Sequence, residues 1–296
     1  MIMKIKRSQP VLTITLSLLT LAALLPLVLI IIVSFSSTES INVNGFTFFP
    51  SSWSLEGWQY VAKYSGQLVR SYGITIYETV VGTLLMLLVT SMFAYALSRT
   101  NWALNPVITV IILLSRLFNG GMVSSYIIRT TVYHLKDNLL VLVLPGAMST
   151  YNCMVMRTYI RSNVPDSLID AAKMDGAGDM FLYFKVILPL MKPCLASLGF
   201  MGAVGHWNEW QTSMLYISDP DKASLQLLLM RIEKSMEYLQ NNMSNLTIAE
   251  IKALQTAPSD SMRMAILCVT MGPILIAYPF FQKYFIKGIT VGSVKG

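Results

Sequence analysis

Long stretches of apolar residues are the feature that most restricts how this chain can fold. Residues 11–33 carry no charged side chain, and five further apolar segments follow at roughly 73–97, 105–128, 138–157, 191–215 and 262–285. A helix needs about 20 residues, at 1.5 Å each, to cross the ~30 Å hydrocarbon layer of a bilayer. Only 12% of the residues are charged, about half the share found in soluble domains. The sequence therefore predicts an all-α integral membrane protein with about six transmembrane helices.

The first apolar segment has features of both a signal peptide and a retained helix. Lys4, Lys6 and Arg7 precede it, as basic residues precede a signal peptide. However, the run is about 23 residues long, and no Ala-x-Ala-like cleavage site follows it. We interpret it as a retained first transmembrane helix.

Basic residues between the apolar segments predict the orientation, because cytoplasmic loops carry the excess of Lys and Arg. With the N-terminus inside, the inner segments hold about eight more positive than negative charges, whereas the outer charges balance. This sorting explains the net charge of +7 without a nucleic-acid partner. Both termini are predicted to be cytoplasmic, in a multi-pass protein of the cell (inner) membrane.

Two long outer loops are expected, at 34–72 and 216–261. Trp53, Trp58 and Tyr60 suggest that the first is a compact loop at the membrane interface, a depth that Trp and Tyr favour. In the second, apolar residues recur three and four positions apart and predict a helix: Leu225, Leu228, Leu229, Ile232, Met236 and Leu239. Thr247 and Glu250 have capping-box spacing before a second short helix that ends at Pro258. These helices could cover a pore mouth, contact a partner or pack on their own membrane domain.

We divide the chain into residues 1–70, the first transmembrane helix with its outer loop, and residues 71–296, a core of five transmembrane helices. The core contains the outer loop 216–261 and an inner loop, 158–190, which is the most informative segment of the sequence.

The inner loop at 158–190 is predicted to be a short helix, a glycine turn and a second helix. Pro165 is typical of a helix start, and Asp166 and Asp170 favour the positive end of the helix dipole. Gly176 ends the first helix, since glycine tolerates the left-handed conformation. The second helix runs to about Leu188 and is followed by Pro189. A helix of about nine residues with small side chains suits docking into another protein, although an ordinary amphipathic loop would have the same pattern.

The same segment resembles the EAA loop of ABC importer permeases. That pattern is Glu-Ala-Ala, two residues, Asp-Gly-Ala and an apolar stretch ending in Leu-Pro. It is matched here without a gap by Asp170-Ala171-Ala172, Asp175-Gly176-Ala177 and Leu188-Pro189. One departure is Asp170, which stands where the pattern has Glu and keeps the carboxylate on a shorter side chain.

Three further segments extend the resemblance to permeases of the carbohydrate-uptake group. They are residues 94–99 at the end of the second helix, residues 206–210 with their Trp-Asn pair, and the tail at 279–288 and 292–296, which is similar to permeases for oligosaccharides or polysaccharide fragments. The resemblance implies the maltose-type fold of a type I importer and half of a translocation pore. It also implies the partners: a second homologous permease subunit, two ATPase subunits and an extracytoplasmic solute-binding protein.

The energy for transport is expected to come from those ATPase subunits. The chain contains no Gly-x-x-x-x-Gly-Lys-Ser/Thr phosphate loop, so ATP and magnesium would be bound by the partners and no cofactor by this chain. The resemblance places the contact with the ATPase at Asp170, Ala171, Ala172, Asp175, Gly176, Ala177 and Pro189. No catalytic residue and no metal site is predicted, because there is no nucleophile–base pair, metal-ligand spacing or cofactor motif.

Polar side chains within the apolar segments are candidates for the solute path, because such groups usually face the protein interior. Amides can hydrogen-bond the hydroxyl groups of a sugar, and aromatic rings can pack on its C–H faces. We select five residues on this basis: Asn119, Tyr151, Asn152, Trp207 and Asn208. Others have a structural explanation: Trp210 as an interface anchor, His206 as a hydrogen bonder between helices, and Glu78 and Arg116 as partners of the second subunit.

Two alternative functions remain open on the sequence. The first is a permease of the same architecture for a non-sugar solute, such as a peptide or polyamine. The second is a self-sufficient secondary carrier, which would leave the EAA-like segment unexplained. The sequence does not identify the sugar, its length or its charge.

Overall fold

The computed structural model describes residues 9–63, 65–99, 103–118, 120–241 and 259–291. Regular structure in these ranges is helical, apart from an isolated antiparallel bridge between Ser36 and Trp53. The chain forms two compact units, which are described separately below. Unit 1 contains residues 1–68 and 229–273, and unit 2 contains residues 69–228 and 274–296. The predicted division at residue 70 stays a prediction.

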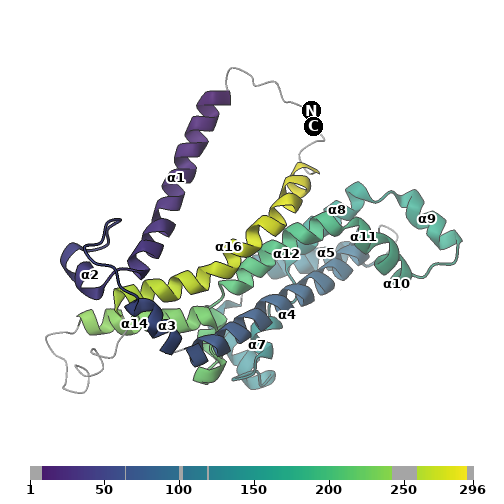
Figure 1. Ribbon diagram of the computed structural model, residues 1–296. Coiled ribbons are helices and arrows are strands. Elements are labelled where there is room, and N and C mark those ends of the chain that lie inside the picture. The colour runs from purple at the N-terminus through teal and green to yellow at the C-terminus, as the bar shows by residue number, and fades with distance from the viewer. Residues whose placement is uncertain (1–8, 64, 100–102, 119, 242–258, 292–296) are drawn as a thin grey trace. The chain divides into compact units, whose positions relative to one another are not determined.

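Three helices are long and apolar enough to cross a membrane. They are α1 (Gln9–Ser34), α4 (Ser65–Ser98) and the first part of α16 (Asp260–Val291), all drawn in Figure 1. Two bent helix pairs also qualify, so the described residues hold up to five spans. The five correspond to the predicted segments 11–33, 73–97, 105–128, 191–215 and 262–285, and they confirm an all-α membrane protein.

The first bent pair joins α5 (Asn105–Leu117) to α6 (Gly121–Ile127) and the π-helix η1 (Ile128–Val132). Gly121 has φ +84°, which is costly for any residue with a Cβ atom. In the second pair, α12 (Lys192–Trp207) is bent by 79° from the helical stretch Asp179–Leu190. Pro189 and Pro193 flank this bend, and each occupies the first turn of a helix, where its missing N–H costs nothing.

The predicted helix at 138–157 is not continuous. Residues 140–143 form α7 (Leu140–Val143), and a new helix, α8 (Thr150–Asn163), begins after a turn that contains Pro145 and Gly146. The polar groups of this turn bond within the protein: the Ser149 N–H donates to the Thr90 hydroxyl at 3.4 Å, and the Ser149 hydroxyl accepts the Asn152 N–H. Apolar composition alone did not reveal the interruption.

Unit 2 has a core cluster at the end that carries the 158–190 loop (Figure 1). Its buried residues come from α4, α5, α8, α12 and the loop itself: Ala94, Tyr95, Leu97, Ile112, Cys153, Met156, Ile160, Val164, Ile169, Leu182, Tyr183, Ile187, Met191, Cys194 and Leu198. Each fully buried large side chain contributes about 1.5–3 kcal/mol of apolar transfer free energy. The inner loop is therefore part of the hydrophobic core and not an appendage.

A smaller cluster lies at the opposite end of unit 2, around α7 and α13 (Gln211–Tyr216). Nearby, Asp137 has φ +57° and accepts the N–H groups of Ser218 at 2.6 Å and Asp219 at 3.1 Å. These two hydrogen bonds hold the pKa of Asp137 below its usual value. The predicted amphipathic helix is confirmed as α14 (Leu225–Asn241), with Leu225 and Leu228 buried. The second short helix, from Thr247 to Pro258, lies outside the described residues.

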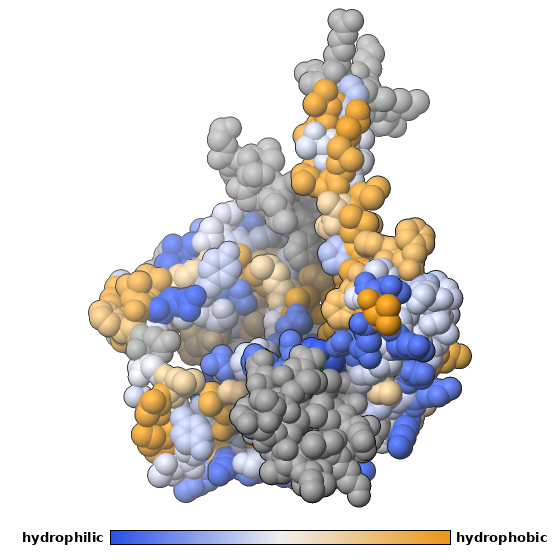
Figure 2. Space-filling view, turned by 90° about the vertical axis from the view of Figure 1, so that its left-hand side faces the viewer, coloured by the Kyte–Doolittle hydropathy of each residue, from blue (hydrophilic) through white to orange (hydrophobic). Residues whose placement is uncertain are grey.

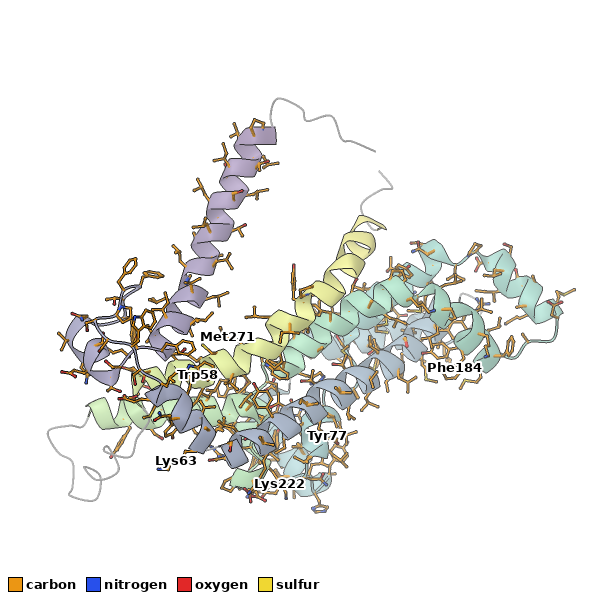
Figure 3. All side chains as sticks on the ribbon, viewed as in Figure 1. Trp58, Lys63, Tyr77, Phe184, Lys222 and Met271 are labelled. Carbon is orange, nitrogen blue, oxygen red and sulfur yellow. The ribbon has the colours of Figure 1, made fainter. Side chains whose placement is uncertain are left out.

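Unit 1 joins α1 to two short helices, α2 (Thr38–Asn44) and α3 (Glu56–Lys63). Trp58, labelled in Figure 3, stacks on Phe35 with ring centroids 5.3 Å apart. A Cβ atom on Gly57 would lie 2.7 Å from the Ser261 carbonyl oxygen. Glycine is required there because α3 packs directly on the start of α16.

Candidate functional site

The first helix of the inner loop, α9 (Asp166–Met174), ends in a tightly defined bend. Gly176 has φ +81°, its N–H donates to the Lys173 carbonyl, and the Ala177 N–H donates to the Ala172 carbonyl, both at 3.0 Å. This pair of hydrogen bonds is the Schellman motif, which fixes the direction in which the chain leaves a helix. The predicted nine-residue helix and the left-handed glycine are both confirmed.

One face of α9 is fixed to the core and the other is open. Ile169 is 2% exposed, and Ala172 and Ala177 pack against the core cluster. Asp170, Ala171, Asp175 and Gly176 are exposed. Two large apolar side chains are also exposed on α9, Leu168 at 41% and Met174 at 89%. Exposed apolar side chains such as Leu168 and Met174, on a helix that is fixed to the core, are suited to a protein contact, because their exposure to water is unfavourable.

A second helical stretch follows, made of α10 (Asp179–Phe181), the π-helix η2 (Leu182–Ile187) and α11 (Leu188–Leu190). It extends to Leu190, close to the predicted end at Leu188, and Pro189 is exposed in its last turn. The π-helical middle was not predicted. Such segments have hydrogen bonds between residues five positions apart and are frequent at functional sites.

Tyr183, on this π-helix, connects the inner loop to the long helix α4. Its ring is 1% exposed, and its hydroxyl lies 2.7 Å from the Ser91 hydroxyl. Its ring centroid lies 5.9 Å from that of Tyr95 and 4.8 Å from that of Phe184, which is labelled in Figure 3. Sequence reasoning missed Tyr183, because a tyrosine in an apolar stretch carries no signal of its partner 92 positions away.

The C-terminal end of α4 is held by side chains from two other helices. The Asn105 amide of α5 and the Arg157 guanidinium of α8 both donate to the Leu97 carbonyl, at 2.9 and 3.0 Å. The Arg161 guanidinium donates to the Ser98 carbonyl at 3.3 Å. The last carbonyls of a helix have no partner within it, so these contacts cap α4 and join α4, α5 and α8 beside the inner loop.

The candidate solute-path residues that the structure describes lie in two places. Tyr151, 63% exposed, and the half-buried Asn152 are in the first turn of α8, and the Asn152 amide lies 3.4 Å from the Met86 sulfur. Trp207 and Asn208 are at the end of α12: Trp207 is 7% exposed and lies edge-on to Tyr72, whereas Asn208 is exposed. Asn119 lies outside the described residues. Trp210 is 41% exposed and Arg116 is exposed.

A buried acid and an imidazole face each other between α4 and α12. Glu78 is fully buried, and its carboxylate oxygen lies 4.0 Å from His206 Nδ1. The histidine ring fits between two glycines, since a Cβ atom on Gly82 would lie 2.7 Å from His206 Cε1 and one on Gly146 would lie 3.0 Å from it. Glu78 is thus enclosed by its own chain, which corrects our expectation that it pairs with a partner subunit.

Comparison with known proteins identifies the class of protein to which the chain belongs. A family model described as "Binding-protein-dependent transport system inner membrane component" matches residues 84–291. The chain is 32% identical to the polygalacturonan/rhamnogalacturonan transport system permease protein YtcP of Bacillus subtilis (strain 168), covering 93% of this chain and 94% of YtcP. It is also 32% identical to protein LplC of the same organism, covering 92% of this chain and 90% of LplC.

A solved structure extends the likeness to the fold. The crystal structure of a bacterial ABC transporter involved in the import of the acidic polysaccharide alginate contains a chain that matches with a TM-score of 0.77 and 29% identity. The match covers 95% of this chain and 99% of that chain. The fold and the inner loop therefore define a membrane permease subunit of an ABC importer. The chain belongs to the family of inner membrane components of binding-protein-dependent transport systems. In this class, ATP hydrolysis takes place in a separate subunit.

Proposed function

We propose that the chain forms half of the pore through which an oligosaccharide or polysaccharide fragment enters the cell. The observation that carries the solute class is the similarity over nearly the whole chain to YtcP, which is named for polygalacturonan and rhamnogalacturonan. The permease of the alginate importer supports an acidic glycan in particular. Tyr151, Asn152 and Asn208 supply accessible aromatic and amide groups of the kind that bind sugars, whereas Trp207 is buried against Tyr72.

The second part of the proposal concerns how ATP hydrolysis reaches the pore. The exposed face of α9 docks on an ATPase subunit through Asp170, Ala171, Asp175 and Gly176, with Met174 as an apolar knob. Ala172 and Ala177 support this face from the core side, and Pro189 begins the turn towards the membrane. The fixed bend at Gly176 supports the proposal, because a displacement is transmitted by packed elements that do not deform.

The proposed assembly contains a second homologous permease subunit, two ATPase subunits and an extracytoplasmic solute-binding protein, all in or against the cell membrane. ATP and magnesium are bound by the ATPase subunits. Both termini of this chain lie in the cytoplasm, where the excess of basic residues places them.

Solute-stimulated ATP hydrolysis by the reconstituted complex tests the solute class. The permease pair, the ATPase and the binding protein are assembled in lipid, and oligogalacturonides, arabinooligosaccharides and peptides are added in turn. We expect stimulation by oligogalacturonides and none by peptides. Stimulation by peptides alone would reject the sugar proposal and favour a permease of the same fold for another solute.

A further inference from the structure

The loop after α1 exposes several large apolar side chains, whereas two of its serines are buried. This loop, residues 35–55, contains α2 and the bridge between Ser36 and Trp53. Ser36 and Ser40 are each 3% exposed, whereas Phe49 is 91% and Trp53 is 65% exposed. Exposed large apolar residues that cluster in this way are informative, since single ones are common on any protein surface.

Serine side chains of the loop hydrogen-bond one another, and they include the buried Ser40 and the exposed Ser51 and Ser52. The Ser37 and Ser52 hydroxyls are 2.6 Å apart, and the Ser51 N–H and hydroxyl both donate to the Ser40 hydroxyl at 3.0 Å. The Asn44 amide donates to the Ser51 hydroxyl at 3.2 Å. Saturating polar groups internally is what a segment in an apolar environment requires, because no water is available there to replace a missing partner.

The outer surface of the loop offers six large apolar side chains that are between 37% and 91% exposed: Val43, Phe46, Phe48, Phe49, Trp53 and Leu55. No charged residue occurs between Glu39 and Glu56. The stretch between Glu39 and Glu56 therefore offers no charge that could complement a charged partner.

The loop directly follows α1, whose surface is itself apolar, with Ile31 near its C-terminal end 49% exposed. In Figure 2 the surface of α1 is mostly hydrophobic, and hydrophobic and hydrophilic residues both lie beneath its lower end. Helix α1 has 26 residues and is about 39 Å long, so it exceeds the ~30 Å hydrocarbon layer and its end reaches the headgroup region. Trp and Phe are favoured at that depth.

From these observations we propose that the 35–55 loop inserts Phe46, Phe49 and Trp53 into the bilayer leaflet at the C-terminal end of α1. The occupant of this surface is lipid, at the boundary between headgroups and acyl chains. The loop thereby anchors unit 1 at a fixed depth. This inference rests on the membrane location of α1 and is independent of the transported solute.

Site-directed spin labelling of the full complex in lipid nanodiscs tests the proposal. Single cysteines replace Phe46, Phe49 and, as a matched control, Gln59, which is exposed on the charged helix α3 of the same unit. The native Cys153, Cys194 and Cys268 are replaced beforehand. We expect labels at 46 and 49 to collide with oxygen, which concentrates in lipid, and to lose their collisions with a water-soluble nickel chelate. The label at 59 should show the reverse.

Two results would overturn the proposal. Frequent nickel collisions at 46 and 49 would place the loop in water. Loss of collisions with both reagents at 46 and 49 would show that another protein subunit covers the loop. Because neither reading depends on added solute, both are distinct from a failure of the proposed sugar transport.

Discussion

Gly176 illustrates how a single backbone angle fixes the way in which a helix ends. At φ +81° the residue directs the chain away from α9 while two hydrogen bonds close the helix end. A branched side chain in this conformation costs about 1–2 kcal/mol. The strain would be relieved by unwinding the last turn of α9, which carries Met174 and the exposed carboxylate of Asp175.

We therefore expect Gly176→Val to hydrolyse ATP in the assembled complex but to move less solute per ATP. Gly178→Val is the matched control, because Gly178 has φ −73° and open space around it. Transport and hydrolysis are measured in the same proteoliposomes. Equal coupling in the two variants would show that the bend has no role in transmitting force.

Gly82 requires its small size for a different reason, the contact with His206. A Cβ atom there would lie 2.7 Å from His206 Cε1, and one on Gly146 would lie 3.0 Å from the same atom. Overpacking of this kind costs about 1–3 kcal/mol. By contrast, Gly73 lies on the same helix α4 with nothing within 4 Å of the added atom.

Gly82→Ala should lower the thermal midpoint of the purified complex, whereas Gly73→Ala should leave it unchanged or raise it, since alanine improves helix stability by up to about 1 kcal/mol. The midpoints are measured in one detergent for both variants. An equal change in both would mean that His206 moves aside freely.

At the scale of elements, the hydrogen bond between Tyr183 and Ser91 joins the inner loop to α4. The Ser91 hydroxyl also approaches the Leu87 carbonyl at 2.5 Å, so Ser91 donates there and Tyr183 donates to Ser91. The two partners are therefore not equivalent. Removing the tyrosine hydroxyl leaves Ser91 with a partner, but removing the serine leaves a buried tyrosine hydroxyl without its acceptor.

We expect Tyr183→Phe to cost about 1 kcal/mol of stability and Ser91→Ala to cost more, up to about 3 kcal/mol. The double variant Ser91→Ala/Tyr183→Phe should regain part of the loss, because no unsatisfied group remains. The free energies of unfolding of the unmodified protein, the two single variants and the double variant, measured in one detergent, give a double-mutant cycle. Additive losses would argue against the hydrogen bond.

The helices that sequence reasoning predicted best are those specified by local rules. The 166–174 helix and its glycine end follow from capping preferences and backbone sterics, and the 225–239 stripe follows from helical periodicity. The break at 144–149 was missed because hydropathy averages over Pro145 and Gly146. The helical stretch at 179–190 was predicted, but its π-helical middle depends on how Leu182, Tyr183 and Ile187 fit the core.

Contacts between residues far apart in the sequence could not be predicted, because they depend on how the helices pack together. Asn105, Arg157 and Arg161 meet at the end of α4 only because three helices converge there. Of the candidate site, the residues from Asp170 to Ala177 lie on α9 and its bend, whereas Pro189 lies in α11, and their contact with an ATPase stays a prediction. The solute-path residues were selected by chemistry alone, and the structure places them at the start of α8 and the end of α12.

At the scale of the whole molecule, the turn at 144–149 separates α7 from α8, which is therefore a rigid element of its own. The helix is a rod of 14 residues, about 21 Å long, with α9 directly after one end. Next to its other end, the Ser149 N–H donates a hydrogen bond to the Thr90 hydroxyl of α4. Because Arg157 and Arg161 also tie α8 to the end of α4, we expect a push on α9 to tilt α8 about residue 149 together with that end of α4.

A tilt has a simple signature, since displacement grows with distance from the pivot. Spin labels at Met174→Cys and Tyr151→Cys, each measured against Val80→Cys on α4, report the two ends of the arm. On ATP binding by the complex, the distance from 174 should change by more than the distance from 151. Equal changes in the two distances would mean that α8 moves along its own axis without tilting.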